Sequence, residues 1–396
     1  MVLYIFVIIG LYQNQKLWYT QIELIWKRIQ RRMIMGRLGI SIYPERSTYE
    51  KDVDYLTKAR KYGFSRVFTS LLQIEDDKET VLNQFTAVVH KAKELGFEVM
   101  VDINPDLFEQ LNISYDDLSF FHEMGADGIR LDLGFTGQEE AKMTRNPYGL
   151  KIEINMSQGT NYVDNIMSYS PNCDNLYGSH NFYPHRYSGL SRAHFDYCTE
   201  KFNRYRLNTM AFVNSQEATF GPWPASDGLC TLEEHRDLPI ETQVKHYVLM
   251  GTINDITIGN AYASEEELQK MSAAFFAEMP TLKVECCEDI TADEKEVLFD
   301  NLHSYRGDRS EYILRSTQTR VKYKNRPFKP HNTRDIVRGD VLIDNCEYGQ
   351  YKGETQIALK PMPNDGRVNV VGRIAPEEVM LLDNLKPWSS FKLEEK

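Results

Sequence analysis

The stretch DGIRLDLGF at residues 127–135 decides the fold class of this chain. Arg130 and Asp132 alternate with apolar residues, and successive side chains of a β-strand point to opposite faces. The segment therefore predicts a strand with one polar and one apolar face. The same alternation occurs in FEVMVDIN (97–104) and LKIEINMS (150–157), and a segment of helix length precedes each of them. Strands that alternate with helices predict βα units built on a parallel sheet.

Helix signals fill the segments between these strands. Ser47 and Glu50 have the spacing of a capping box ahead of an apolar periodicity, and Ser114 and Asp117 have a similar arrangement. A third periodicity covers 81–95. All three patterns stop at a glycine, which is typical of a helix C-terminus.

This rhythm continues over the larger part of the chain. Eight candidate strands fall within about 230 residues, the usual size of a (β/α)₈ TIM barrel, and a helix at 265–276 would close the set. We prefer this barrel to a doubly wound open sheet, because no strand leads directly into the GxGxxG motif of dinucleotide sites. The candidate strands are 37–44, 65–72, 97–104, 127–135, 150–157, 175–184, 209–216 and 254–260.

The pattern changes near Pro280, where short strands separated by Gly, Asn, Asp and Pro replace the βα alternation. We therefore expect an α/β protein with three regions. These are an atypical N-terminal extension at 1–34, a TIM-barrel catalytic domain at 35–280 and a smaller β-rich domain at 281–396.

The N-terminal extension has two interpretations. Its apolar run at 2–12 is too short for a bilayer span, which needs about 20 residues. A mis-assigned start, with Met33 or Met35 as the true first residue, is the preferred interpretation. Membrane-surface binding by an amphipathic helix at 18–35 is the alternative. A membrane partner is therefore not expected.

Charge and cysteine usage exclude several classes of protein. The chain of 396 residues has 46 Lys and Arg against 57 Asp and Glu, a net charge of −11, and it lacks a dense basic stripe. Nucleic acid is therefore not the expected partner, because phosphate backbones are held mainly by positive charge. The six cysteines lack CxxC spacing, which indicates reduced thiols in a cytoplasmic protein. A homo-oligomer is compatible with the sequence.

Polar residues gather at the carboxyl ends of the predicted strands, where TIM barrels place their active sites. Burying an unpaired carboxylate costs several kcal/mol, so such a set is either an ion-pair network or a functional site. A bridge from Arg130 to Asp102 or Glu153 is the structural alternative. The candidates on these strands and the loops after them are Tyr43, Glu45, Asp102, Asn104, Arg130, Asp132, Glu153, Asn155, His180, Asn181, Tyr183 and Glu217.

The residue types favour one barrel chemistry over two others. Schiff-base chemistry needs a desolvated lysine, and the strands offer only Lys151 at the beginning of one strand. A metal-dependent hydrolase would need HxH at the end of the first strand, so neither a metal nor another cofactor is expected. Paired carboxylates near Trp223 and other sugar-binding side chains favour glycoside hydrolysis. In that reaction one acid protonates the leaving oxygen and a second carboxylate acts as nucleophile or base.

Several blocks also resemble one family. GISIYPE, RLDLGFTG, IEINMS, GSHNFYPHRYSGLS, NSQEATFGPWPASDGLCTLEEHR and DITIGNAYAS, followed by the β-rich region, are similar to the MupG-type 6-phospho-N-acetylmuramidases of glycoside hydrolase family 170. The resemblance implies a TIM barrel joined to a cyclophilin-like β-barrel. It also implies cytoplasmic hydrolysis of the β-1,4 bond between N-acetylmuramic acid 6-phosphate and N-acetylglucosamine, a phosphorylated disaccharide from peptidoglycan recycling.

Catalytic roles are assigned on physical grounds. Asp132 and Glu153 are the leading pair, because they lie on adjacent predicted strands and both point inward by parity. Glu153 is the expected general acid, with its pKa raised by Asp132, and Asp132 is the nucleophile or electrostatic stabiliser. Glu217 competes for either role. Substrate assistance by the 2-acetamido group stays an alternative.

The implied substrate carries a phosphate and a carboxylate, which require local positive charge. Arginine suits phosphate because its fork donates two hydrogen bonds at once. His180 and Asn181 are expected to bind sugar hydroxyls, although a packed core histidine is the alternative for His180. Tyr43 and Tyr183 would either stack on a sugar face or pack in the protein, and the sequence leaves both open. The further substrate-binding candidates are Arg130, Arg192, Glu234, His235, Arg236 and Arg334.

Two rival functions follow from the same residues. A phosphosugar isomerase or epimerase would also use paired carboxylates on a barrel. A non-catalytic saccharide-binding protein at a surface would use the apolar N-terminus instead. Only a hydrolase releases two sugars, so a product assay separates it from both.

Overall fold

The computed structural model describes residues 36–396 apart from 72–77, 104–107, 109–112 and 225–226. The expected extension at 1–34 and the candidate Asn104 lie outside the described residues. The chain divides into two compact units. The barrel unit comprises the described residues up to 182 together with 192–212 and 252–258, and the second unit comprises 183–191, 213–251 and 259–396.

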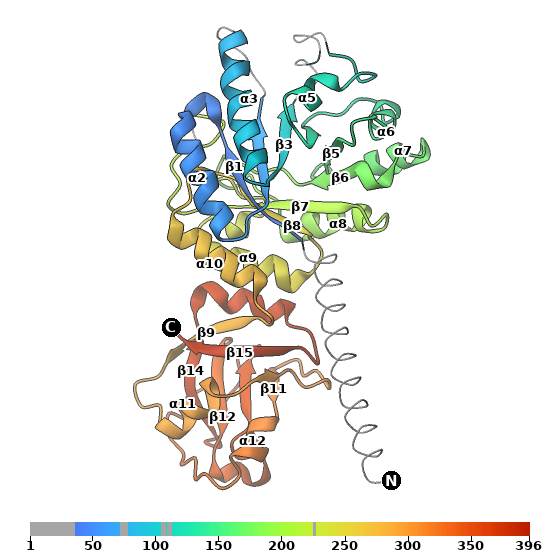
Figure 1. The fold of residues 1–396 in the computed structure, drawn as a ribbon. Helices are drawn as coiled ribbons and strands as arrows, with labels where there is room; N and C mark the ends of the chain where they lie inside the picture. Colours follow the sequence, from blue (N-terminus) through green and yellow to red (C-terminus); the bar gives the residue numbers. More distant parts are fainter. Residues whose placement is uncertain (1–35, 72–77, 104–107, 109–112, 225–226) are drawn as a thin grey trace, which may run out of the picture. The chain divides into compact units, whose positions relative to one another are not determined.

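The expected TIM barrel is confirmed. Its eight strands form one closed sheet in sequence order, and the strand pairs for which a register is defined are all parallel (Figure 1). Every predicted strand overlaps one of them, and only β7 begins earlier than predicted, by one residue. The strands are β1 (Leu38–Ile42), β2 (Arg66–Ser70), β3 (Glu98–Ile103), β4 (Gly128–Leu131), β5 (Lys151–Asn155), β6 (Leu176–Ser179), β7 (Asn208–Val213) and β8 (Asp255–Ile258).

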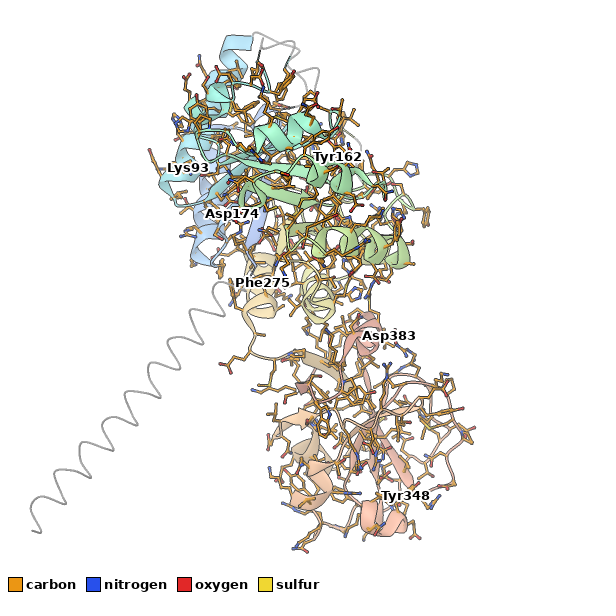
Figure 2. The ribbon with its side chains drawn as sticks, turned by 90° about the vertical axis from the view of Figure 1, so that its right-hand side faces the viewer. Lys93, Tyr162, Asp174, Phe275, Tyr348 and Asp383 are labelled. Carbon is orange, nitrogen blue, oxygen red and sulfur yellow. The ribbon has the colours of Figure 1, made fainter. Side chains whose placement is uncertain are left out.

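Helices alternate with the strands in the barrel unit. The residues at the helix ends test the predicted start and stop signals. Gly63, Gly96 and Gly125 all have positive φ, as the predicted C-terminal glycines require. The helices are α2 (Tyr49–Lys61), α3 (Lys78–Glu94), α5 (Ser119–Glu123), α6 (Gln138–Met143), α7 (Tyr162–Ser168) and α8 (Arg192–Asn203). Tyr162 and Lys93, labelled in Figure 2, belong to α7 and α3.

The two predicted capping boxes are wrong. Thr48 occupies the N-cap position of α2, one residue later than expected, and its side chain makes no capping hydrogen bond. Ser114 and Asp117 instead form an isolated bridge ahead of the short α5, and Asp117 accepts a hydrogen bond from the backbone N–H of Ser119 at 2.9 Å.

The second unit contains a seven-stranded sheet in the order β10-β15-β9-β14-β12-β13-β11. Neighbours are antiparallel except β15 and β9, which are parallel. Its apolar core includes Leu282, Val341, Ile357 and Phe391, none of which is exposed. The strands are β9 (Thr281–Cys286), β10 (His303–Ser304), β11 (Ile313–Ser316), β12 (Asp340–Asp344), β13 (Thr355–Ala358), β14 (Val368–Ile374) and β15 (Ser390–Glu395).

Helices complete the second unit. Among them, α10 and α11 begin with true capping boxes at Ser264 and Thr291. Across the described part of the chain, no helix is both long and apolar enough to cross a bilayer. The helices are α9 (Ile240–Met250), α10 (Glu265–Phe276), α11 (Ala292–Phe299), α12 (Gln318–Lys322) and the 3₁₀ segments η3 (Glu233–His235), η4 (Cys346–Tyr351) and η5 (Pro376–Asn384).

Candidate active site

The guanidinium of Arg130 organises the carboxyl ends of β3, β4 and β6. Its Nη1 donates to Asp102 Oδ1 at 2.6 Å and to Asp132 Oδ1 at 3.3 Å. Its Nε donates to Ser179 Oγ at 2.8 Å, and its Nη2 donates to Asn181 Oδ1. Arg130 is buried and has four of its five N–H groups engaged. The bridge to Asp102 is therefore confirmed as an arrangement, and Arg130 serves the protein more readily than a substrate phosphate.

Two carboxylates share one nitrogen in this cluster, but their environments differ. Asp102 is 4% exposed, whereas the side chain of Asp132 is 39% exposed. Burial raises the pKa of Asp102 to about 7, although Arg130 lowers it and the charge of Asp132 raises it further. Asp102 is therefore about half protonated near neutral pH, and Asp132 is the carboxylate that solvent reaches.

The residues after β1 hold another acid with a raised pKa. Glu45 is exposed, yet the protein around its carboxyl group raises its pKa to about 7, and Arg46 opposes this shift. Tyr43 lies buried two residues before it. Desolvation raises the pKa of Tyr43 above its usual value, and the charge of Asp102 adds to the shift. Tyr43 thus stays protonated, and because it is only 2% exposed it packs inside the protein rather than stacking on a sugar face.

Glu153 does not join this cluster, and the expectation that it is the general acid is wrong. Its side chain is 0% exposed and forms an ion pair with Arg66, which also binds Asp255 at 2.8 Å. Arg66 and Asp255 are the first residues of β2 and β8, so the pair lies toward the amino ends of the strands. Parity correctly places Glu153 inside the barrel, but its partner draws it away from the carboxyl ends.

A layer of aromatic rings also lies inside the barrel. Phe68 lies between Arg66 and Ser70 along β2. Its ring makes edge contacts with Phe212 at 5.1 Å and with Phe182 at 6.0 Å between centroids. The interior of the barrel therefore holds packed phenyl rings beside two polar groups, and these groups still interact, because Glu153 and Arg130 are register partners and the charge of Glu153 acts on Arg130 and Asp102.

His180 is a packed core histidine, and the expectation that it binds sugar hydroxyls is wrong. It is fully buried and stacks on Phe195. Its Nδ1 and Nε2 lie 3.1 and 2.9 Å from the hydroxyls of Ser157 and Thr199. Desolvation lowers the pKa of His180 to about 3, so the ring is neutral, and both of its nitrogens already have partners.

The candidate asparagines that the structure describes, Asn155 and Asn181, lie at the ends of β5 and β6. The side-chain oxygen of Asn181 accepts from Arg130, and its backbone N–H donates to Ser157 Oγ at 2.9 Å. Asn155 accepts from the backbone of Ser157 at 2.9 Å. Both side chains are partly exposed, so a role in binding sugar hydroxyls stays a prediction.

Two candidate arginines are held by acidic partners. Arg334 makes a bidentate pair with Asp340 at 2.7 and 3.0 Å, within the second unit. Arg192 pairs with Asp196 one helical turn along α8 at 2.9 Å. Asp340, the partner of Arg334, is fully buried, and breaking the pair would leave the charge of Asp340 uncompensated. Arg334 is therefore a structural residue, in contrast to the expectation from sequence.

Arg236 is also structural. Its Nε and Nη2 donate to Glu233 at 2.7 and 2.6 Å, and its Nη1 donates to the carbonyl oxygens of Tyr183 and Asp227. The hydrogen bonds from Arg236 lower the pKa of Glu233 to about 2. The buried guanidinium fixes the loops of the TLEEHR block, so it is not available for a phosphate, as the sequence had suggested.

The remaining candidates of the second unit lie around the same block. Glu217 is exposed in the loop after β7, and its N–H donates to Ser215 Oγ at 3.2 Å. Glu234, His235 and His246 place one ligand atom each within 4.8 Å of one another. However, His235 Nε2 lies 2.8 Å from His246 Nδ1, and a hydrogen bond between the rings accounts for both nitrogens without an ion.

Sequence reasoning missed Ser179 and the aromatic layer. Ser179 precedes Asn181 by two residues, so the parity that indicated Asn181 also places Ser179 inside the barrel. Phe182 and Phe212 carried no such signal, because an aromatic residue inside a barrel looks the same in sequence as one that packs under a helix.

The barrel and its cluster define the class of protein. A TIM barrel with carboxylates gathered at the carboxyl ends of its strands, continued by a separate β-sheet, is an architecture typical of enzymes. Two family models match along it: the N-terminal region of 6-phospho-N-acetylmuramidase at residues 38–273 and its C-terminal region at 280–394. The chain belongs to the 6-phospho-N-acetylmuramidase (MupG) family.

Two solved structures are similar over almost the whole chain. One is described as an uncharacterized B. cereus protein, with 48% identity, a TM-score of 0.83, and coverage of 91% of this chain and 100% of that one. The other is a conserved Enterococcus faecalis protein of unknown function, with 25% identity, a TM-score of 0.71, and coverage of 91% and 97%. No curated protein matches the chain.

Proposed function

We propose that this protein is a cytoplasmic glycosidase that hydrolyses the β-1,4 bond between N-acetylmuramic acid 6-phosphate and N-acetylglucosamine during cell-wall recycling. The family match supports the reaction. The observation that carries the proposal is the Arg130 cluster, where an exposed and a buried carboxylate share one guanidinium nitrogen at the strand ends. The six free cysteines are consistent with a reducing compartment.

Asp132 is the carboxylate that we assign to the anomeric centre. It is solvent-accessible and fixed by Arg130, so it can stabilise the positive charge of an oxocarbenium-like transition state or attack it directly. It can equally orient the substrate's 2-acetamido group. Asp102 is a positioning residue in this scheme. Because its pKa of about 7 leaves it only partly ionised near neutral pH, it limits the negative charge around Asp132 while it still pairs with Arg130.

Glu45 is the residue that we assign as general acid, in place of Glu153. It follows β1 directly, it is exposed, and its pKa of about 7 matches the protonation that a leaving oxygen requires at neutral pH. Glu217 is the competing acid, and the two are separated by comparing the variants Glu45→Gln and Glu217→Gln. Whichever residue is the general acid, its Gln variant should regain activity on a substrate whose leaving group needs no proton.

Arg192 is the remaining candidate for the substrate phosphate. Its pair with Asp196 is exposed and joins residues four apart on one helix, so releasing it costs only about 0.3–0.5 kcal/mol. A phosphate dianion can outcompete that partner through a bidentate contact. We expect Arg192→Ala to raise KM for the phosphorylated disaccharide and to leave kcat nearly unchanged.

Product analysis tests the reaction itself. The full chain is incubated with the disaccharide in its phosphorylated and unphosphorylated forms, and the products are separated by mass. The proposal requires two monosaccharides from the phosphorylated form at a much higher rate than from the other. Conversion to an isomer of unchanged mass would replace the hydrolase by the isomerase, and binding without any product would favour a saccharide-binding protein.

A further inference from the structure

A cavity of about 410 Å³ lies in the β-rich part of the second unit, apart from every residue assigned above. It is lined by the loop after β10, the residues after β13 and the end of η5. Asp383, labelled in Figure 2, belongs to η5 and lines it. This volume falls in the range of about 300–1,000 Å³ that small-molecule sites occupy.

The charged side chains of the lining have an excess of one positive charge. Three cationic side chains, Arg309, Arg338 and Lys360, face two carboxylates, Glu311 and Asp383. Arg338 is held in place, because it donates to Asp383 at 2.9 Å and to the carbonyl oxygen of Leu359 at 3.0 Å. The pair between Lys360 and Glu311 is exposed on both sides, so exchanging Glu311 for another anion would cost little.

Arg309 and Tyr305 supply unused donors. Within the described parts of the chain, the guanidinium of Arg309 has no acidic or hydrogen-bonding partner. Tyr305 is 2% exposed, and its hydroxyl is buried with no partner among the same residues. A buried hydroxyl without a partner costs about 1–3 kcal/mol, a penalty that an acceptor oxygen in the cavity would remove.

The combination specifies the chemistry of a ligand. Arg309, Lys360, Ser310 and Tyr305 approach the cavity from different positions, which suits a tetrahedral anion with several acceptor oxygens better than a planar carboxylate. Leu359 and Leu382 line the same cavity and would contact a carbon skeleton. We propose that this cavity binds a small phosphate monoester.

Trp388 offers a local signal for the test. Its ring is 77% exposed and lies against Gly307, where an added Cβ would approach the ring to 2.1 Å. Its backbone N–H donates to the carbonyl oxygen of Tyr305 at 2.8 Å. Binding at Tyr305 should therefore change the fluorescence of Trp388, and Trp388→Phe should remove that change.

The experiment titrates the full chain with inorganic phosphate, with N-acetylglucosamine 6-phosphate and with N-acetylglucosamine. We expect saturable changes with the first two probes and none with the third. Arg309→Ala and Tyr305→Phe should each weaken binding of the sugar phosphate about tenfold or more, the effect of one charge-assisted hydrogen bond. The matched control is Arg306→Ala, since Arg306 pairs with Asp308 and does not line the cavity.

Three results would overturn the proposal. The first is the absence of a saturable change with either phosphate probe. The second is equal weakening by Arg306→Ala and Arg309→Ala, which would indicate diffuse attraction to a charged surface. The third is a fluorescence change that survives in Trp388→Phe, because the probe would then bind elsewhere in the molecule.

Discussion

Glu153 and Asp132 show how position along a strand decides the role of a carboxylate. Both were expected at the mouth of the barrel, yet Glu153 is sealed against Arg66 and only Asp132 reaches solvent. Breaking a buried ion pair by removing one partner costs about 3–5 kcal/mol, because the other charge stays buried. We predict that Glu153→Gln lowers the free energy of unfolding by about that amount, measured by urea denaturation.

The stability of Asp132→Asn should be measured beside that of Glu153→Gln. An exposed carboxylate 3.3 Å from its cation contributes little to folding, so we expect a change within about 1 kcal/mol. If Glu153→Gln were as stable as the unaltered chain, or if Asp132→Asn were the more destabilised of the two, the division between a structural and a functional carboxylate would be wrong.

The raised pKa of Glu45 predicts how activity depends on pH. A general acid must be protonated, and above its pKa of about 7 the protonated fraction falls tenfold per pH unit. The rate kcat/KM should therefore decline above pH 7, and the residual rate of Glu45→Gln should lack this decline. Steady-state rates between pH 5 and 9 measure it, and an unchanged alkaline limb in Glu45→Gln would assign the proton to another residue.

The alternation of side chains along the strands and the positions of the strand ends predicted part of the site. They placed Asp102, Arg130 and Asp132 on one polar face, and the bridge between the first two was among the stated alternatives. They could not tell at which height of the barrel Glu153 acts, because its partner Arg66 lies on a strand three positions away in the sheet. Burial of His180 behind Phe195 depends on such distant packing in the same way.

At the scale of elements, β12 ends in a buried carboxylate with a measurable consequence. Desolvation and the nearby Glu354 raise the pKa of Asp344 to about 8. The unfolded chain releases this proton near pH 4, so between about pH 4 and 8 the native state binds more protons and stability falls as pH rises. The slope is at most about 1.4 kcal/mol per pH unit.

Asp344→Asn should remove that slope. The asparagine keeps an oxygen that can accept the hydrogen bond from Gln356, which Asp344 receives at 3.0 Å. Urea midpoints at pH 5 and pH 8 should converge in the variant relative to the unaltered chain, mainly through a gain at pH 8. A variant that loses as much stability between these pH values as the original would show that Asp344 is ionised in the native state.

The sequence signals predicted the strands more accurately than the helix starts. Strand alternation located all eight barrel strands, because a half-polar strand has the same period wherever it packs. The S/T-x-x-D/E spacing failed at Ser47 and Ser114 but forms real capping boxes at Ser264 and Thr291. The motif forms a capping box only where the serine or threonine occupies the N-cap position, and the conformation of the preceding backbone determines whether it does.

At the scale of the whole molecule, the net charge of −11 opposes an anionic substrate. Repulsion between exposed charges is screened over about 8 Å at physiological salt, so local hydrogen bonds outweigh it. We predict that raising the salt concentration lowers KM modestly, through weaker long-range repulsion, until the pair between substrate phosphate and Arg192 is itself screened. Rates across a salt series measure this, and a KM that rises steadily from low salt would contradict it.

The division of the chain was only partly accessible from sequence. The change of pattern near Pro280 marks the start of β9, but segments 183–191 and 213–251 group with the second unit although they lie between barrel strands. Long loops such as that between β7 and α9 carry no periodic pattern, so their contacts cannot be assigned before the fold is known.

The most direct test of the central claim is the turnover of Asp132→Asn on the phosphorylated disaccharide, beside the control Asp116→Asn. Asp116 is an exposed carboxylate of the same unit that pairs with Lys142. We predict a loss of at least about a thousandfold in kcat for Asp132→Asn and less than a twofold change for Asp116→Asn, with both variants folded. Turnover of Asp132→Asn within tenfold of the unaltered protein would contradict a reaction carried out by the carboxylates at the Arg130 cluster.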